Sequence, residues 1–444
     1  MTAVLACLLS AVDAFAGEEN WAQWRGPNQN GATASAHDLP VQFGPDRNMR
    51  WKVALPSWSA ATPVVWGDTI FVTSAEEGFH DVQQYKPGEQ PKAGAKPEPG
   101  SATRDKILLL AINRADGKIR WNRQIGDHNR IYRKHNLASP SPVTDGRRVW
   151  AMTGGGSLRC FDFEGKQLWE RDIQHDYGAF GLNHGYASSP LLDSGRLYIQ
   201  VLHGMRTDDP SYVFAVDAST GKTLWKVERP TDAPNESPDD YSTPIIATID
   251  GQRQLIVSGG DYVTGHSLQT GKEVWRMGGF NPGAERFYRT IASSLAIGDV
   301  IYTTSTRGKP FIAFRAGGKG PLPPSAMVWQ NDLGSDVPTP TTDGRRIFVV
   351  NDRGIVVALD AKTGKVLWDR ERIEPGIYSA SPLLADGKIY ATNEDGTTTV
   401  LSAGPEFEIL TVNRLDSHTL ASPVAVGDQL FIRTAEYLYC FSKK

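Results

Sequence analysis

The sequence predicts an all-β protein, an eight-bladed β-propeller of four-stranded antiparallel blades whose last blade is closed by an N-terminal strand. Three observations predict this fold. A Ser/Thr-Pro motif recurs along the chain, a tight turn of Asp and Gly follows each copy, and a tryptophan ends most of the repeated units. The 44 glycines and 12 tryptophans of the 444 residues favour many short strands over long helices.

Each unit opens with a Ser/Ala-rich strand that carries the Ser/Thr-Pro motif. The motif lies at Thr62, Ser141, Ser189, Thr243, Thr339, Ser381 and Ser422, and Ser294-Leu295 takes the same slot without proline. The turns that follow are at residues 67–68, 145–146, 193–195, 250–251, 298–299, 343–344, 386–387 and 427–428. Each turn leads into a β-branched or aromatic run, so the chain contains eight predicted hairpins.

The third part of the unit is a strand, a turn and another strand. It is clearest at residues 215–225 and 358–368, where Asp can cap the turn and Gly supplies a positive φ. A large ring at the end of each unit suggests a wedge between neighbouring sheets. The predicted docking residues are Trp51, Trp121, Trp169, Trp225, Trp275, Trp329 and Trp368.

The eighth unit contains only three strands, at residues 421–426, 429–434 and 437–441. A strand at residues 49–53 precedes the first unit and contains Trp51. We expect this strand to complete the last blade, which would remove both free edges of the ring. Residues 49–444 are therefore predicted to form one domain, with a hydrophilic insertion loop at residues 77–105 in its first blade.

Residues 1–16 are mostly apolar and end in Ala14-Phe15-Ala16, which is typical of a signal peptide. Residues 17–48 then form a leader segment, in which Trp21, Trp24 and Arg25 either pack across the ring or mark a partner site. Leu5-Ala6-Cys7 also resembles a lipoprotein cleavage box. The sequence predicts an exported protein, periplasmic or extracellular, with membrane anchoring by lipidation as an alternative and no transmembrane segment in the mature chain.

The charge and the cysteines exclude other classes. The 47 basic and 50 acidic side chains give a net charge of −3 without a basic patch, so nucleic acid is not an expected partner. Cys160 and Cys440 occupy one repeat position, where small residues stand in the other units. We expect them to be buried free thiols.

The repeats at residues 215–225 and 358–368 resemble those of the pyrroloquinoline-quinone-like β-propeller superfamily, with the pattern Ala-x-Asp-x-x-Thr-Gly-Lys-x-x-Trp. The resemblance implies one of two branches: quinoprotein dehydrogenases, which hold the quinone and Ca²⁺ in the channel, or a non-enzymatic envelope scaffold similar to the outer-membrane β-barrel assembly lipoprotein B. The chain lacks the adjacent cysteines of the dehydrogenases. Its acidic pairs, Asp208-Asp209 and Asp239-Asp240, lie outside any recognisable calcium loop and are expected to be solvated, so no metal site is predicted.

Polar and aromatic residues stand just before the inner strands, where they should crowd the channel mouth. These candidate binding residues are His135, Asn136, Asn183, His184, Tyr186, Tyr241, Arg289, Tyr378 and His418. Such a set suits a pocket or docking surface, although each residue could equally serve only to fill the channel mouth. No Gly-x-Ser-x-Gly nucleophile motif or His-Glu-x-x-His metal motif occurs, so no catalytic residue is predicted.

The favoured function is a non-catalytic exported propeller that serves as a protein-binding or assembly scaffold in the cell envelope. Its predicted partner is an envelope protein or peptide, and the propeller itself is expected to be a monomer without a cofactor. One alternative is a quinoprotein-like oxidoreductase that binds pyrroloquinoline quinone and Ca²⁺. A second alternative is a carbohydrate-binding propeller, in which aromatic side chains at the channel mouth bind a glycan.

Overall fold

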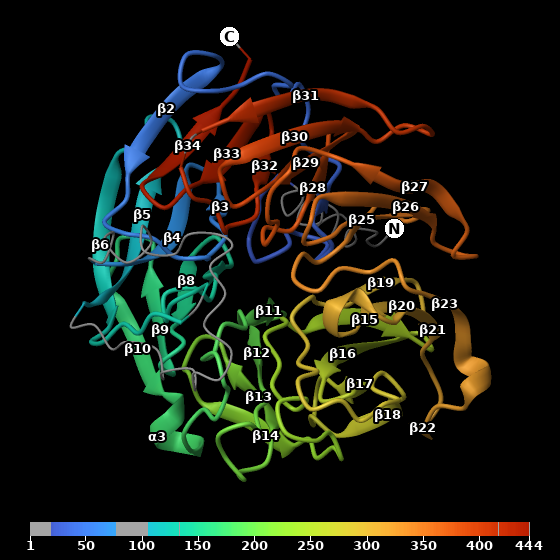
Figure 1. The fold of residues 1–444 in the computed structure, drawn as a ribbon. Coiled ribbons are helices and arrows are strands. Elements are labelled where there is room, and N and C mark those ends of the chain that lie inside the picture. Colours follow the sequence, from blue (N-terminus) through green and yellow to red (C-terminus); the bar gives the residue numbers. More distant parts are fainter. Residues whose placement is uncertain (1–18, 77–104, 133, 416, 444) are drawn as a thin grey trace, which may run out of the picture.

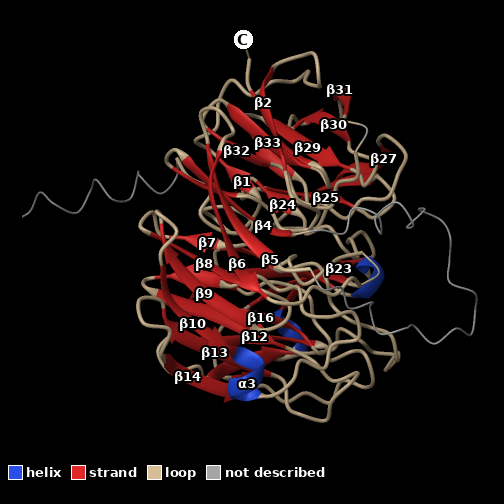
Figure 2. Ribbon diagram, turned by 90° about the vertical axis from the view of Figure 1, so that its left-hand side faces the viewer, coloured by secondary structure: helices blue, strands red, loops and turns tan. Residues whose placement is uncertain are grey.

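The computed structural model describes residues 19–76, 105–132, 134–415 and 417–443. Within them, eight sheets are arranged in a closed ring (Figure 1), which confirms the predicted fold. Figure 2 shows sheets of strands joined by many loops, with helix confined to short pieces. The predicted signal peptide and nearly all of the insertion at residues 77–105 lie outside the described residues.

Each blade consists of four consecutive antiparallel strands, with the innermost strand first. The first blade contains β3 (Val64–Trp66), β4 (Thr69–Ala75), β5 (Ile107–Asn113) and β6 (Ile119–Gly126), and the second contains β7 (Val143–Thr144), β8 (Arg148–Met152), β9 (Ser157–Asp162) and β10 (Gln167–Asp172). The third blade contains β11 (Leu191–Asp193), β12 (Arg196–Val201), β13 (Tyr212–Asp217) and β14 (Thr223–Glu228). The fourth contains β15 (Ile245–Ile249), β16 (Gln252–Gly259), β17 (Tyr262–Ser267) and β18 (Glu273–Met277).

The next three blades repeat this order. The fifth blade contains β19 (Leu295–Ile297), β20 (Val300–Thr304), β21 (Phe311–Arg315) and β23 (Met327–Asn331). The sixth contains β24 (Thr341–Thr342), β25 (Arg346–Val350), β26 (Ile355–Asp360) and β27 (Val366–Arg372). The seventh contains β28 (Leu383–Ala385), β29 (Lys388–Thr392), β30 (Thr397–Ser402) and β31 (Ile409–Arg414). Helix α3 (Ile173–Tyr177) follows β10, and two short 3-10 turns lie at Thr306–Gly308 and Pro324–Ala326.

The eighth blade joins the two ends of the ring. It contains β32 (Val424–Val426), β33 (Gln429–Arg433) and β34 (Tyr437–Phe441), and β2 (Met49–Ala54) pairs antiparallel with β34 as its outer strand. In this register Trp51 lies opposite Cys440. The blue β2 beside the red β34 in Figure 1 confirms the predicted closure by the N-terminal strand.

Two blades gain a short fifth strand that the repeat pattern did not predict. In the seventh blade β1 (Ala32–Thr33) pairs parallel with the inner strand β28, and in the fourth blade β22 (Gly320–Pro321) pairs parallel with the outer strand β18. Both additions come from segments outside the repeat, and both cover a sheet edge that would otherwise have free backbone groups. No helix in the described part of the chain has the length and apolarity needed to cross a membrane.

The seven repeat tryptophans lie at the junctions between blades. Six of them donate the indole N–H to a backbone carbonyl in the turn between the third and fourth strands of the next blade, as Trp169 does to Ala218 at 3.0 Å. Trp275 is the exception, because its indole bonds to Gln254 in its own blade at 2.8 Å. In the fifth blade, which follows that of Trp275, the long connection at residues 316–325 joins the third and fourth strands, so the short turn that the other tryptophans contact is missing.

The turn in each clear repeat has the predicted chemistry. The Asp217 carboxylate accepts the backbone N–H groups of Ser219 and Thr220 at 3.0 and 2.9 Å. Gly221 has φ of 71°, and a Cβ there would lie 2.7 Å from the ring of Trp169. Glycine is therefore required both for the backbone conformation and for the close approach of the tryptophan.

The leader segment packs across one end of the ring. The inner-strand N–H groups of Val65 and Thr144 donate to the carbonyls of Trp21 and Ala22 at 2.8 and 2.9 Å. The guanidinium of Arg25 is buried and donates to the carbonyls of Pro340 and Pro382 at 2.6 and 3.0 Å. The leader thus ties blades on opposite sides of the ring together and covers the free edges of their inner strands.

Candidate functional site

A closed circle of hydrogen bonds joins the Ser/Thr-Pro motifs of all eight blades. Each motif residue donates its backbone N–H to the hydroxyl oxygen of the motif residue in the next blade, at 2.8 to 3.3 Å. In order, the members of this hydroxyl ring are Thr62, Ser141, Ser189, Thr243, Ser293, Thr339, Ser381 and Ser422, and Ser422 donates back to Thr62. The placement of Ser294-Leu295 in this slot is wrong by one residue, because Ser293 holds the hydroxyl position in the fifth blade and Ser294 stands where the other blades have proline.

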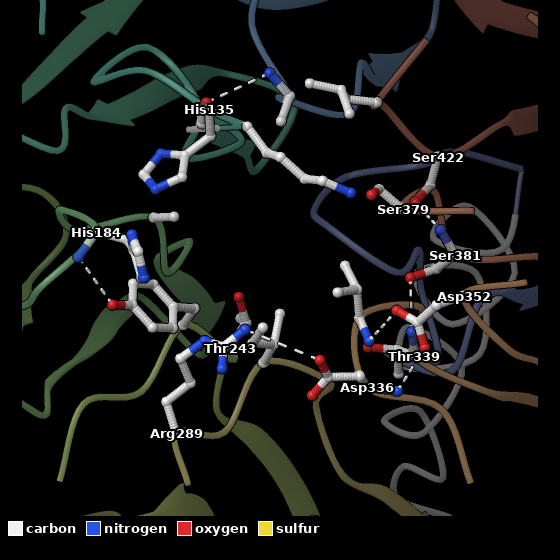
Figure 3. A pocket seen from close by; sticks show the side chains of 18 of the residues that line it. His135, His184, Thr243, Arg289, Asp336, Thr339, Asp352, Ser379, Ser381 and Ser422 are labelled. Carbon is white, nitrogen blue, oxygen red and sulfur yellow. Dashed lines mark hydrogen bonds and ion pairs between the residues drawn. The ribbon is translucent and has the colours of Figure 1, made fainter. Parts of the chain in front are cut away.

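The central cavity lies inside this ring and has a volume of about 750 Å³. Seven of the eight ring residues line it, together with side chains from the connections between blades and Trp24 from the leader. The inner strands start at the face where the blade-to-blade connections emerge, which we call the connection face. Polar residues from the connection face, the hydroxyl ring and Trp24 of the leader therefore all contribute to the cavity wall. Figure 3 shows Thr243, Thr339, Ser381 and Ser422 of the ring around the same space as His135, His184 and Arg289.

Four of the predicted residues line the cavity: His135, His184, Tyr241 and Arg289. The ring of His135 stacks on Tyr132, with centroids 5.3 Å apart, and burial lowers the pKa of His135 to about 4. The backbone N–H of His184 donates to the Tyr241 hydroxyl at 3.1 Å. Near neutral pH, His135 is therefore an uncharged ring at the cavity wall.

The other predicted residues do not line the cavity. Asn136 is buried and donates to the carbonyl of Trp58 at 2.9 Å. Tyr186 and Tyr378 are also buried, and their hydroxyls donate to the carbonyls of Gln200 and Glu374 at 3.0 and 2.7 Å. Burial lowers the pKa of His418. The sequence placed these residues correctly before the inner strands, but it could not distinguish side chains that face the cavity from those that pack between blades.

Asn183 belongs to a buried polar network beside the cavity. Its side chain donates to Glu236 at 2.8 Å, and its backbone N–H donates to Asp239 at 2.6 Å. Asp239 also accepts the N–H groups of Gly204 and Met205, while Asp240 accepts from Ser242 and Gln200. The expectation that the Asp239-Asp240 pair is solvated is thus wrong, because both side chains are buried and hold loops in place. Asp208 and Asp209 are exposed, as expected.

Sequence reasoning missed several charged residues at the cavity. Lys134 donates to the buried carboxylate of Glu394 at 2.9 Å, and Arg289 lies 3.8 Å from Asp336. Burial raises the pKa of Asp352, whose carboxylate accepts the backbone N–H groups at residues 336 and 337. In Figure 3 the two aspartates lie across the cavity from His135 and His184. No sequence motif marks Lys134, Asp336 and Asp352, because they come from the β6–β7 connection, the β23–β24 connection and the β25–β26 turn, respectively.

A protein-family model described as outer membrane protein assembly factor BamB matches residues 104–370 and 322–405 of the chain. These matches cover more than half of the sequence and most of the ring. The chain belongs to the BamB family. Membership agrees with the resemblance expected from the repeats and places the protein among propellers rather than among other repeat folds.

Individual relatives of this BamB-family propeller are distant. The outer membrane protein assembly factor BamB of Yersinia pestis is 22% identical over 72% of this chain and 77% of its own length. Tetrathionate hydrolase of Acidithiobacillus ferrooxidans is 24% identical over 97% of this chain and 79% of its own. The structure of quinohemoprotein alcohol dehydrogenase from Comamonas testosteroni superposes with a TM-score of 0.67 at 12% identity, covering 98% of this chain and 82% of the dehydrogenase. The last similarity shows the shared fold alone.

The acidic groups at the cavity of this BamB-family chain, and its two cysteines, are the side chains that bear on a metal or quinone site. Among the described residues, no group of three or more His, Cys, Asp or Glu side chains could hold a metal ion. The carboxylates that line the cavity, on Asp336 and Asp352, accept backbone N–H groups. Cys160 and Cys440 lie in different blades as buried free thiols, and burial raises the pKa of each to about 12.

Proposed function

We propose that this protein is a non-catalytic, exported BamB-family propeller that binds another protein of the cell envelope through its connection face. Two things support the proposal. The family model and the Yersinia pestis relative are both described as an outer membrane protein assembly factor. The connection face of this chain also presents exposed apolar side chains on loops that are held rigidly. In this proposal the propeller acts as a monomer in the periplasm.

The observation that carries the proposal is a group of three interlocked loops, residues 203–211, 230–241 and 278–290, which we call the platform. Phe287 is 57% exposed and Met205 is 37% exposed, one on each outer loop of the platform. Exposed apolar surface that forms a patch marks protein docking sites, and a few large side chains supply most of the binding energy there. Lone exposed apolar residues are common on protein surfaces. The docking proposal therefore rests on the hydrogen bonds that join the loops carrying Phe287 and Met205.

The middle loop of the platform bonds to both of its neighbours. Met205 donates its N–H to Asp239 at 3.1 Å, and Glu236 donates its N–H to the carbonyl of Arg286 at 3.1 Å. Thr290 donates its N–H to the carbonyl of Asp239 at 3.3 Å. Because these hydrogen bonds already join the three loops, a partner that binds there needs to fix less of their conformational freedom.

Photo-crosslinking tests the proposal. A benzophenone side chain at position 287 should crosslink the native protein to one discrete envelope protein in intact cells. The same group at Leu224, which is 44% exposed on β14 at the outer edge of the ring, is the matched control and should give no such product. Equal crosslinking at both positions, or none at position 287, would contradict the proposal.

A paired variant gives a second measurement. The double variant Phe287→Ser, Met205→Ser should no longer co-purify with the envelope protein that crosslinking identifies. The unfolding midpoint of the propeller should stay unchanged, because both side chains are largely in solvent. If the variant co-purifies with the same envelope protein as well as the wild type does, the platform is not the binding site.

A quinoprotein-like oxidoreductase is the second candidate, because the repeats at residues 215–225 and 358–368 resemble those of the pyrroloquinoline-quinone-like superfamily. Titration of the purified protein with pyrroloquinoline quinone and Ca²⁺ tests it. Saturable binding together with dye-linked oxidation of an alcohol or sugar would favour this candidate over the scaffold. A glycan-binding role has less support, because the rings of Tyr186 and Tyr378 are buried and cannot stack on a sugar in the cavity.

A further inference from the structure

The residues that line the central cavity include more cations than carboxylates, although the whole chain carries a net charge of −3. Five cationic side chains line it, against two carboxylates. The cations are Lys134, Arg289, Arg307, Lys309 and Arg353, and the carboxylates are Asp336 and Asp352. Charges of one sign inside a concave, low-dielectric wall reinforce one another, so the local potential differs from that of the whole molecule.

Two of these cations have no carboxylate to neutralise them. Lys134 lies 2.9 Å from Glu394, Arg289 lies 3.8 Å from Asp336, and Lys309 lies 3.8 Å from Asp332. In the described part of the chain, no carboxylate lies within 4 Å of the guanidinium of Arg307 or Arg353. A guanidinium has five N–H donors in a planar fork that matches the oxygens of a phosphate, sulfate or carboxylate group.

The two carboxylates that line the cavity already accept hydrogen bonds from backbone N–H groups. The backbone N–H of Arg307 donates to Asp336 at 2.7 Å, and the N–H groups of Asp336 and Val337 donate to Asp352 at 2.9 and 3.1 Å. These bonds hold both carboxylates in the wall by backbone groups rather than by the free arginines. The side chains of Arg307 and Arg353 therefore remain as donors at the cavity mouth.

The hydroxyl ring adds donors further inside. Each ring oxygen accepts a backbone N–H, and no acceptor is found for its own proton among the residues that the structure describes. The Tyr241 hydroxyl likewise accepts the N–H of His184, and burial keeps the pKa of Tyr241 well above 10, so it stays protonated. The cavity thus combines two free guanidinium groups with hydroxyl donors, which is a donor set for an anion.

We propose that the central cavity binds a small polyvalent oxyanion, a molecule that carries phosphate, sulfate or carboxylate groups. Arg307 and Arg353 take its charged groups at the mouth, and the hydroxyl ring donates to oxygens that reach further in. The volume of about 750 Å³ is in the range of small-molecule sites and exceeds that of a single inorganic ion. This site is separate from the platform and does not depend on the proposed scaffold function.

Isothermal titration of the purified protein with pyrophosphate at low ionic strength tests the site. Binding should saturate at one molecule per chain and weaken as salt is added, since screening acts over about 10 Å at 0.1 M ionic strength. Arg307→Gln and Arg353→Gln should each weaken binding by about tenfold, the effect of losing one charge-assisted hydrogen bond. Glucose, an uncharged molecule that is rich in hydroxyl groups, should not bind.

Matched controls make the test specific to the cavity. Arg147 and Arg345 are exposed arginines in the β7–β8 and β24–β25 turns, on the face opposite the connections. Arg147→Gln and Arg345→Gln should leave pyrophosphate binding unchanged, and unchanged circular dichroism spectra should show that all four variants are folded. No binding to the wild-type protein, an equal loss in the control variants, or glucose binding as tight as pyrophosphate binding would each overturn the proposal.

Discussion

Replacement of Ser381 by alanine should measure how much the hydroxyl ring stabilises the propeller. The Ser381 hydroxyl accepts the backbone N–H of Thr339 at 2.9 Å, and both residues are buried, at 4% and 1% exposed. Ser381→Ala leaves that N–H without a partner and removes no other hydrogen bond, because the N–H of Ser381 still donates to Ser422. An orphaned buried donor costs about 1–3 kcal/mol, so we expect a loss of about 2 kcal/mol.

This loss can be converted into a thermal shift. With an unfolding entropy of about 2.1 cal/mol/K per residue, roughly 400 folded residues give about 0.8 kcal/mol/K, so a loss of about 2 kcal/mol lowers the Tm by only about 2 °C. Urea titration followed by tryptophan fluorescence is the more sensitive assay. The midpoint should fall while the slope of the transition stays the same.

Ser381→Thr is the matched variant, since the ring already uses threonine at Thr62, Thr243 and Thr339. It retains the hydroxyl and should lie within about 0.5 kcal/mol of the wild type. If the alanine and threonine variants are equally stable, the hydroxyl ring does not contribute to the stability of the fold and the reasoning fails.

Three further predictions concern the ring closure and a buried acid. Trp51→Ala should destabilise the protein by about 3–5 kcal/mol, because a buried indole and its bond to Arg114 are lost; a loss below about 1 kcal/mol in urea titration would contradict the docking role. Deletion of residues 49–53 opens the ring and should replace one cooperative calorimetric transition by a broad one; an unchanged transition would refute the closure. Burial raises the pKa of Asp240 to about 8, so the folded state holds a proton that the unfolded state releases near pH 4. Stability should therefore decline as the pH rises from about 4 to about 8, and Asp240→Asn should remove that part of the decline; identical pH profiles for the two proteins would contradict this.

The structure corrects the sequence-based view mainly at buried polar residues. The Asp239-Asp240 pair looked like a solvated surface feature, yet both carboxylates are buried and accept hydrogen bonds from three loops. Tyr378 stands at the same repeat position as Asp336, which lines the cavity, but Tyr378 is buried and its hydroxyl donates to the carbonyl of Glu374. Local sequence does not encode these directions, because they depend on which neighbouring chain segment supplies a partner.

The repeat by itself determined the number of blades, the hairpins within them, the tryptophan at seven of the eight junctions and the N-terminal strand that completes the last blade. These features follow from local chemistry, because proline and glycine end strands and β-branched or aromatic runs form them. A blade with only three strands of its own leaves a free edge, so another segment must supply the fourth strand. Only the tertiary structure decided which side chains line the central cavity, including which four of the nine candidate binding residues do so. Lys134, Arg307, Asp352 and Trp24 lie in segments far apart in the sequence, and they come together because closing the ring brings the inner ends of eight separate units to one axis.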